Sequence, residues 1–355
     1  MVTVYYYTSW YPVFIYTEID NRWTTLPMSK IESRYHWTQI TLPQLQEFVF
    51  TDGMNYWDNP IDSQNYKVSG AGVYAVFHGR VIQINTKPSH LLLITDLDNT
   101  LVGWNREAKN SLKKFNNFWI SNHYFNGSKL VYNTGRSFDG YIDLFQRGFE
   151  LLDPDLLIVS VGSNAYTINP NNGEYVNRED YNSFIQKENW DSFIINRLLL
   201  YEFKWLKLPG FIHIFPGKII LKSSVEDMSA NFSRFKEFLR NKGNHERCEK
   251  VINARAILSR DGEDYMIDIV PLEGGKKLGV LFAQEMFGFR DEETLVAGDS
   301  ENDIQMFRGN HWGVCVANSQ GELVAWLQKK NRSNKYKSEC QYADAIIEAA
   351  LKITS

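Results

Sequence analysis

The chain has 355 residues, and 38 Lys and Arg against 42 Asp and Glu give it a net charge of −4. This balance, without a basic stripe, argues against a nucleic-acid partner. No apolar run reaches the roughly 18 residues of a membrane-spanning helix, so we expect no membrane partner. Three cysteines without metal-ligand spacing indicate a reducing compartment. We expect the cytoplasm, and a plastid stays open if a transit peptide precedes this chain.

Residues 1–86 predict a small module of β-strands. Four segments are rich in aromatic and β-branched side chains: 2–7, 38–42, 47–50 and 72–77. Turns with Pro, Gly, Asn and Asp separate them, which favours an all-β sandwich of antiparallel strands. The polar stretch 86–89 is typical of a linker, and the chain is longer than one ordinary domain. We therefore expect a second unit from about residue 90 onward.

A pair of carboxylates follows the first strand of this second unit. The apolar residues 91–94 predict a buried strand, and Asp96 and Asp98 come directly after it. Ligands bind at the carboxyl ends of parallel strands. Two close carboxylates resist joint ionisation unless a cation compensates, and Mg²⁺ is well suited to this. The alternative is a solvated turn in which Asp and Asn make local hydrogen bonds.

Three later segments add groups that bind phosphate or metal. A strand over 129–133 leads to Thr134 and Gly135, whose hydroxyl and backbone N–H can cradle a phosphate. Lys276 and Lys277 follow a pair of glycines. A third strand, 294–298, ends in an acidic cluster that contains Asp299 and Asp303. A helix that begins near Ser300 would bring the second of these carboxylates back toward the first.

The order and spacing of these motifs resemble the haloacid-dehalogenase (HAD) phosphatase superfamily. The matching segments are DLDNT at 96–100, NTGRS at 133–137 and GDSENDIQMF at 298–307. Relatives commonly have Lys-Gly where this chain has two lysines. We assign the motif lysine to Lys276 by its spacing after residues 268–271, with Lys277 as the alternative. Further segments resemble the sucrose-phosphate phosphatases: SVGS at 160–163, VANSQGEL at 316–323 and ADAII at 343–347.

This resemblance implies a Rossmann-like parallel sheet and roles for the motif residues. Asp96 would attack phosphorus and form an aspartyl-phosphate, while Asp98 would act as general acid and then as general base. The implied phosphate ligands are Thr134, Gly135 and Lys276. The implied Mg²⁺ ligands are Asp96, Asp98 through its backbone carbonyl, Asp299, Asn302 and Asp303. For Arg136, contact with the phosphate and support of a neighbouring catalytic group are both open.

The core pattern is interrupted between its second and third motifs. An amphipathic run, an alternating segment, a strand and a helix are expected there, at 182–207, 211–215, 218–222 and 229–241. We expect a large inserted α/β cap over 167–271, and a core formed by 90–166 and 272–355. Such a lid usually carries specificity. His213 within it either contacts a sugar hydroxyl or is an ordinary position of a half-exposed strand.

The N-terminal module resembles starch-binding modules of carbohydrate-binding families 25 and 53. The clearest matching segments are WDN at 57–59, followed by NY at 65–66, and FVFTDG at 48–53. The resemblance implies that aromatic faces stack on glucose rings and polar groups bind hydroxyls. The implied glucan ligands are Tyr16, Trp23, Trp57, Asn59 and Asn65. The family often has His at the position of Tyr16, and both asparagines could simply cap turns. A purely structural role for all the tryptophans is the alternative.

Together these expectations describe a magnesium-dependent phosphohydrolase that acts on a sugar phosphate and is tethered to starch or another α-glucan. Two alternatives stay open. A phosphatase of phosphorylated glucan would use the module to deliver its substrate. A glucan-associated scaffold with an inactive phosphatase part would not be an enzyme.

Overall fold

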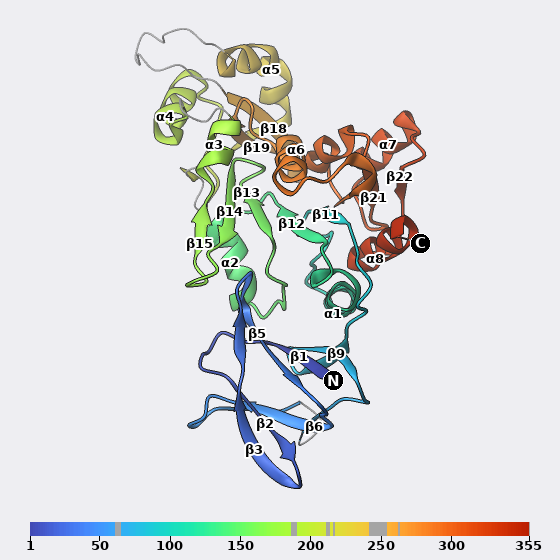
Figure 1. Ribbon diagram of the computed structural model, residues 1–355. Coiled ribbons are helices and arrows are strands. Elements are labelled where there is room, and N and C mark those ends of the chain that lie inside the picture. Colours follow the sequence, from blue (N-terminus) through green and yellow to red (C-terminus); the bar gives the residue numbers. More distant parts are fainter. Residues whose placement is uncertain are drawn as a thin grey trace. The chain divides into compact units, whose positions relative to one another are not determined.

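A computed structural model describes residues 1–60, 65–185, 190–210, 214–215, 217–240, 254–261 and 263–354. The chain forms two compact units (Figure 1). The first unit contains Met1–His90 with Lys113–Ser128 and Ile168–Val176, and the second contains the remaining residues. Within the described ranges, no helix is both long and apolar enough to cross a membrane. His213 lies outside the described residues.

The N-terminal module consists of two five-stranded sheets that share one core. One sheet has the order β10-β9-β1-β5-β4, and in the other the order is β3-β2-β6-β7 with β8 also paired to β6. The strands of the first are β1 (Val2–Tyr7), β4 (Ser29–Ile31), β5 (Arg34–Leu42), β9 (Gly72–Phe77) and β10 (Arg80–Gln83). Those of the second are β2 (Phe14–Ile19), β3 (Arg22–Pro27), β6 (Glu47–Thr51), β7 (Trp57–Asp58) and β8 (Tyr66–Lys67).

Alternating burial explains why these segments form a sandwich. In β1 every second side chain is buried, and Val4 packs with Ile15 and Phe50 of the other sheet. The predicted all-β module is therefore confirmed. One pairing differs from the antiparallel expectation, because β1 runs parallel to β9. Trp37 is fully buried in the module, so its role is structural.

The core of the second unit is built on an eight-stranded sheet with the order β15-β14-β13-β12-β11-β20-β21-β22. Its strands are β11 (Leu92–Thr95), β12 (Lys129–Asn133), β13 (Leu156–Val159), β14 (Asn164–Ile168), β15 (Tyr175–Asn177), β20 (Thr294–Gly298), β21 (Trp312–Cys315) and β22 (Lys335–Lys337). The six strands from β13 to β22 in this order run parallel, and β14 is antiparallel to β13. Strands β11, β13 and β20 are buried along their whole length, as expected for a sheet covered on both faces.

Helices surround this sheet. They are α1 (Arg106–Trp119), α2 (Phe138–Gln146), α3 (Glu179–Phe184), α6 (Lys276–Phe287), α7 (Gly321–Lys330) and α8 (Tyr342–Thr354). A 3₁₀ helix, η4 (Glu301–Arg308), follows β20, a short 3₁₀ helix, η3 (Asp291–Glu293), precedes that strand, and a π-helix, η1 (Ile120–Tyr124), follows α1. Val280 of α6 and Leu323 of α7 pack with Ile94 and Val296 of the central strands.

The inserted cap has a sheet and a core of its own. Its strands follow the order β16-β17-β19-β18 and are all antiparallel. They are β16 (Ile214–Phe215), β17 (Lys218–Ser224), β18 (Ala254–Asp261) and β19 (Asp264–Pro271), with helices α4 (Ser192–Glu202) and α5 (Val225–Leu239). Leu199, Phe235 and Ile267 meet in the cap core. The expected boundary after residue 166 falls inside β14, which belongs to the core sheet together with β15.

Candidate active site

Two neighbouring strands place two carboxylates side by side. Strands β11 and β20 are parallel, with Thr95 opposite Ala297, and the Asp96 N–H donates to the carbonyl of Ala297. Asp96 therefore leaves the sheet next to Asp299. The parallel register explains why two motifs about 200 residues apart in the sequence meet at one edge of the sheet.

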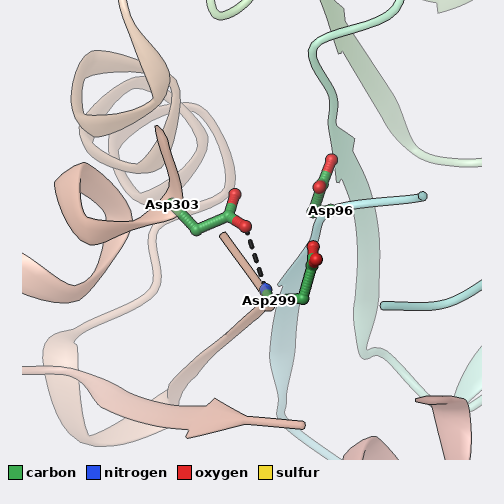
Figure 2. A group of neighbouring side chains, drawn as sticks. All are labelled: Asp96, Asp299 and Asp303. Atoms are coloured by element: carbon green, nitrogen blue, oxygen red, sulfur yellow. Dashed lines mark hydrogen bonds between the residues drawn. The ribbon is translucent and has the colours of Figure 1, made fainter. Parts of the chain in front are cut away.

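Helix η4 returns a third carboxylate to the same place. Ser300 caps this helix, and Asp303 accepts hydrogen bonds from the backbone N–H groups of Asp299 and Ser300 at 2.9 and 3.0 Å. Carboxylate oxygens of Asp96, Asp299 and Asp303 lie within 4.8 Å of one another. Figure 2 shows the three side chains together, with the hydrogen bond from the Asp299 N–H to Asp303. The helix is 3₁₀ rather than α, but it brings Asp303 back toward Asp299 as the spacing predicts.

A buried lysine lies among these carboxylates. Lys276 begins α6 directly after Gly275, and its side chain is completely buried. Its Nζ is 2.6 Å from Asp303 Oδ1 and 2.9 Å from Asp96 Oδ1. Lys277 is exposed. The structure thus brings Lys276, and not its neighbour, to the acidic cluster.

Burial and mutual repulsion shift the acidity of the cluster. Burial, followed by the charges of Asp303 and Asp98, raises the pKa of Asp96 to about 7, against the opposing effect of Lys276. Burial and the neighbouring carboxylates of Asp303 and Asp96 raise the pKa of Asp299 to about 8. Burial disfavours the charged form of Lys276, but Asp303 and Asp96 outweigh it and raise its pKa. Among the described residues, Lys276 is the lysine paired with these carboxylates, which therefore resist joint ionisation.

The second motif forms a loop beside this cluster. Thr134 is buried, and its Oγ1 accepts a hydrogen bond from the N–H of Arg136 at 3.2 Å. A Cβ placed on Gly135 would lie 3.9 Å from Nδ2 of Asn302, so the loop borders η4. The side chain of Arg136 pairs with Asp98, with Nε 2.7 Å from Oδ2 and Nη2 2.7 Å from Oδ1.

Sequence reasoning missed three residues at the site. Thr100 donates to Asp299 Oδ1 at 3.1 Å, and its place at the end of the DLDNT motif was the available signal. Lys218 of the cap donates from Nζ to the carbonyl of Gly135 at 2.9 Å and lies 3.1 Å from Asp268. Arg255 of the cap donates to Gln305 Oε1 at 2.8 Å. Spacing in the sequence carries no signal for the two cap residues.

Three of the predicted glucan ligands gather on the outer face of the β3-β2-β6-β7 sheet. The ring centroid of Tyr16 is 5.0 Å from that of Trp23 and 5.4 Å from that of Trp57. The two tryptophans are 41% and 53% exposed. Asn59 is exposed, whereas Asn65 donates to Glu47 Oε2 at 3.0 Å.

A polar cleft adjoins this aromatic cluster. Its volume is about 560 Å³, and Trp23 forms part of its wall. Its other lining residues include Glu18, Asn21, Gln44 and Gln46. Aromatic rings beside carboxylates and amides are suited to binding sugars. The rings can stack on the C–H face of a pyranose, and the polar groups can form hydrogen bonds with its hydroxyls.

A largely parallel sheet with an acidic cluster at its carboxyl edge and an inserted α/β cap defines a HAD-like phosphatase fold. The family model for "Sucrose-6F-phosphate phosphohydrolase" matches residues 89–209 and 240–352. The chain belongs to this family.

Individual relatives agree with this assignment. A probable sucrose-phosphatase 3a from Arabidopsis thaliana is 32% identical over 266 residues, which are 70% of this chain and 55% of the relative. The chain spans about half the length of curated plant relatives that it matches. The sucrose-phosphatase of Synechocystis sp. PCC6803, solved with sucrose and phosphate, is 27% identical with a TM-score of 0.60 and covers 75% of this chain and 98% of that chain.

The comparison with solved structures also gave a match to a carbohydrate-binding module. The CBM25 of a Bacillus halodurans amylase, solved with maltotetraose, is 26% identical and covers 24% of this chain and 98% of that chain. The TM-score is 0.21, which is too low to show a shared fold.

Proposed function

We propose that the chain is a magnesium-dependent phosphohydrolase of a sugar phosphate, with its phosphatase part in residues 90–355. The observation that carries this proposal is the buried cluster of Asp96, Asp299 and Asp303 around Lys276. So dense a set of buried charges is costly for the fold and is typical of a site that binds a cation and a phosphate. The sucrose-phosphatase relatives support sucrose 6-phosphate or a similar disaccharide phosphate as the substrate.

The residues fit a magnesium ion. Three carboxylates share one small space and have a single lysine as counter-charge, so a divalent cation would complete the balance. We assign Asp96, Asp299 and the Asp98 carbonyl to it, with Asn302 and Asp303 as ligands or as groups that orient them. When bound, the ion would supply positive charge against the oxygens of the phosphoryl group.

The mechanism follows from the position of each group. Asp96 attacks phosphorus, and the bond from phosphorus to the sugar oxygen breaks as Asp98 gives that oxygen a proton. Asp98 then takes a proton from water, whose oxygen attacks phosphorus and displaces Asp96, which releases inorganic phosphate. Lys276, Thr134 and the Gly135 N–H bind the phosphoryl oxygens as their charge redistributes.

A substrate panel tests this function. We expect phosphate release in the presence of Mg²⁺ from sucrose 6-phosphate above trehalose 6-phosphate, glucose 6-phosphate and phosphorylated amylopectin. Asp96→Asn should lower turnover by about a thousandfold or more, because the amide has nearly the same shape and is a poor nucleophile. Asp143→Asn, at a partly exposed carboxylate of α2, is the matched control and should leave turnover unchanged.

The outcomes separate the alternatives. Preferred release from amylopectin would favour the phosphorylated-glucan reaction. Activity of Asp96→Asn equal to that of the parent would remove Asp96 from its role, and an inactive parent would favour the scaffold.

We also propose that the N-terminal module, residues 1–86, binds starch or another α-glucan. The supporting observation is the exposed cluster of Tyr16, Trp23 and Trp57 beside a polar cleft. Exposed indoles on a stable sandwich are unusual unless they meet a ligand or partner. We also propose a reducing compartment such as the cytoplasm; Cys315 and Cys340, the two cysteines among the described residues, are free thiols.

A further inference from the structure

Arg136 is fixed in place by three hydrogen bonds from its side chain. Nε and Nη2 each approach a different oxygen of Asp98 at 2.7 Å, which is the bidentate geometry of an arginine and a carboxylate. Nη1 donates to the carbonyl of Gly140 at 2.8 Å. Gly140 lies in the first turn of α2, where its N–H donates to the capping Ser137. The guanidinium is therefore tied to a helix end as well as to Asp98.

This arrangement leaves Asp98 with one orientation. Its side chain is 40% exposed, so without the arginine it would rotate in solvent. The two charge-assisted hydrogen bonds fix the plane of the carboxylate. Asp98 occupies the Nε–Nη2 edge of the guanidinium, so this edge is not open to a phosphate.

The proposed reaction asks two different things of Asp98. It must give a proton to the leaving oxygen in the first step and take one from water in the second. Both oxygens of Asp98 are held by Arg136, so the place from which Asp98 gives or takes a proton depends on the arginine. The arginine therefore sets the position of this carboxylate in both steps.

We infer that Arg136 is a positioning residue that acts through Asp98 and is not a ligand of the phosphate. This inference rests on the phosphohydrolase function proposed above. It resolves the two roles left open for Arg136 by the sequence, and it predicts that the effect of losing Arg136 depends on Asp98 being present.

A double-mutant cycle tests this inference in the full chain with Mg²⁺. The variants are Arg136→Gln, Asp98→Asn and both together, assayed for kcat, KM and inhibition by inorganic phosphate. Arg136→Gln should lower kcat by about tenfold or more, because a catalytic group that is slightly misplaced loses most of its effect. In the Asp98→Asn background the same change should have almost no further effect on kcat. Inhibition by phosphate should change by less than about twofold in both backgrounds.

Two further variants separate positioning from a general loss of structure. Arg136→Lys keeps the charge but cannot form the two-point contact, so it should restore only part of kcat. Arg147→Gln removes another arginine that pairs with a carboxylate of α2, Asp143, and should leave kcat unchanged. Each variant should keep the melting temperature of the parent within a few degrees.

Three results would overturn the inference. These are equal losses of kcat with and without Asp98, weaker phosphate inhibition once Arg136 is removed, and full activity of Arg136→Gln. An inactive parent chain would count instead against the proposed function, so the two failures are distinguishable.

Discussion

Three carboxylates that share a buried space repel one another, and this repulsion makes the stability of the fold depend on pH. Folding raises the pKa of Asp96 to about 7 and that of Asp299 to about 8, from about 4 in an unfolded chain. A carboxyl group with a raised pKa destabilises the fold once it ionises. The metal-free protein should therefore lose stability as pH rises from about 4 to 8.

Magnesium should reverse this loss, and more strongly at higher pH. The ion binds the ionised carboxylates, so fewer protons must leave at pH 8 than at pH 6. At about 100 times its Kd a bound ion contributes about 2.7 kcal/mol, or on the order of 5–10 °C in melting temperature. Differential scanning calorimetry at pH 6 and pH 8, with Mg²⁺ or with EDTA, measures the gain. Asp299→Asn should lower this gain in melting temperature. An equal gain at both pH values would contradict the assignment of these carboxylates as Mg²⁺ ligands.

The meeting of Asp96, Asp299 and Asp303 could be predicted because it depends on backbone geometry. Parallel strands end at one edge, and a helical turn brings back a residue four positions later. The contacts from Arg136 to Asp98 and from Lys218 to Gly135 could not be predicted. They join residues 38 and 83 positions apart and depend on which way long side chains turn.

At the scale of elements, the cap contributes a buried cation to the loop that contains Thr134 and Gly135. Lys218 at the start of β17 is ion-paired with Asp268, and its ammonium donates to the Gly135 carbonyl. An inserted lid that touches this loop can couple closure over the sugar to the orientation of the loop.

Lys218→Met should therefore weaken substrate use. The change keeps the aliphatic stem and removes the ammonium, so we expect KM for the sugar phosphate to rise by about tenfold. Lys222→Met is the matched control, because Lys222 lies farther along the same strand and pairs with Asp264. Steady-state kinetics of both variants provide the measurement. A rise in KM of the same size for Lys222→Met would show that any loss of charge on β17 disturbs the cap.

Element boundaries were the weakest part of the sequence prediction. The amphipathic run 182–207 is predicted as one segment, but it holds the end of α3, at Phe184, and the whole of α4, which begins at Ser192. Tyr181 packs into the phosphatase core, whereas Leu199 packs into the cap core. A 3.6-residue period of apolar residues indicates that one face of a helix is buried, but it does not indicate which of the two cores buries that face.

At the scale of the whole molecule, the proposed glucan surface and the proposed catalytic site belong to different units. The full chain should sediment with granular starch. Trp23→Ala and Trp57→Ala should each weaken this binding by about tenfold, because an aromatic face on a sugar contributes about a kcal/mol or more. Neither change should alter turnover of a small soluble phosphate ester, since the acidic cluster belongs to the other unit.

Trp104→Ala is the matched control for starch binding, since this indole is 55% exposed and lies in the phosphatase unit. Circular dichroism and a cooperative melt should show that the module variants stay folded. A folded Trp23→Ala, Trp57→Ala double variant that binds starch and β-cyclodextrin like the parent would place the glucan surface elsewhere.

The position of strand β1 in its sheet makes the folding of the module depend on the order in which its strands are synthesised. This strand precedes the other strands of its sheet in the sequence, yet it lies in the interior of that sheet, between β5 and β9. One side of β1 therefore has no partner until residues up to Phe77 have left the ribosome. During that interval its Val-, Tyr- and Thr-rich edge is open to other nascent chains, a known route to aggregation. Slower translation around β9 should lower the soluble yield, whereas slower translation after residue 90 should not.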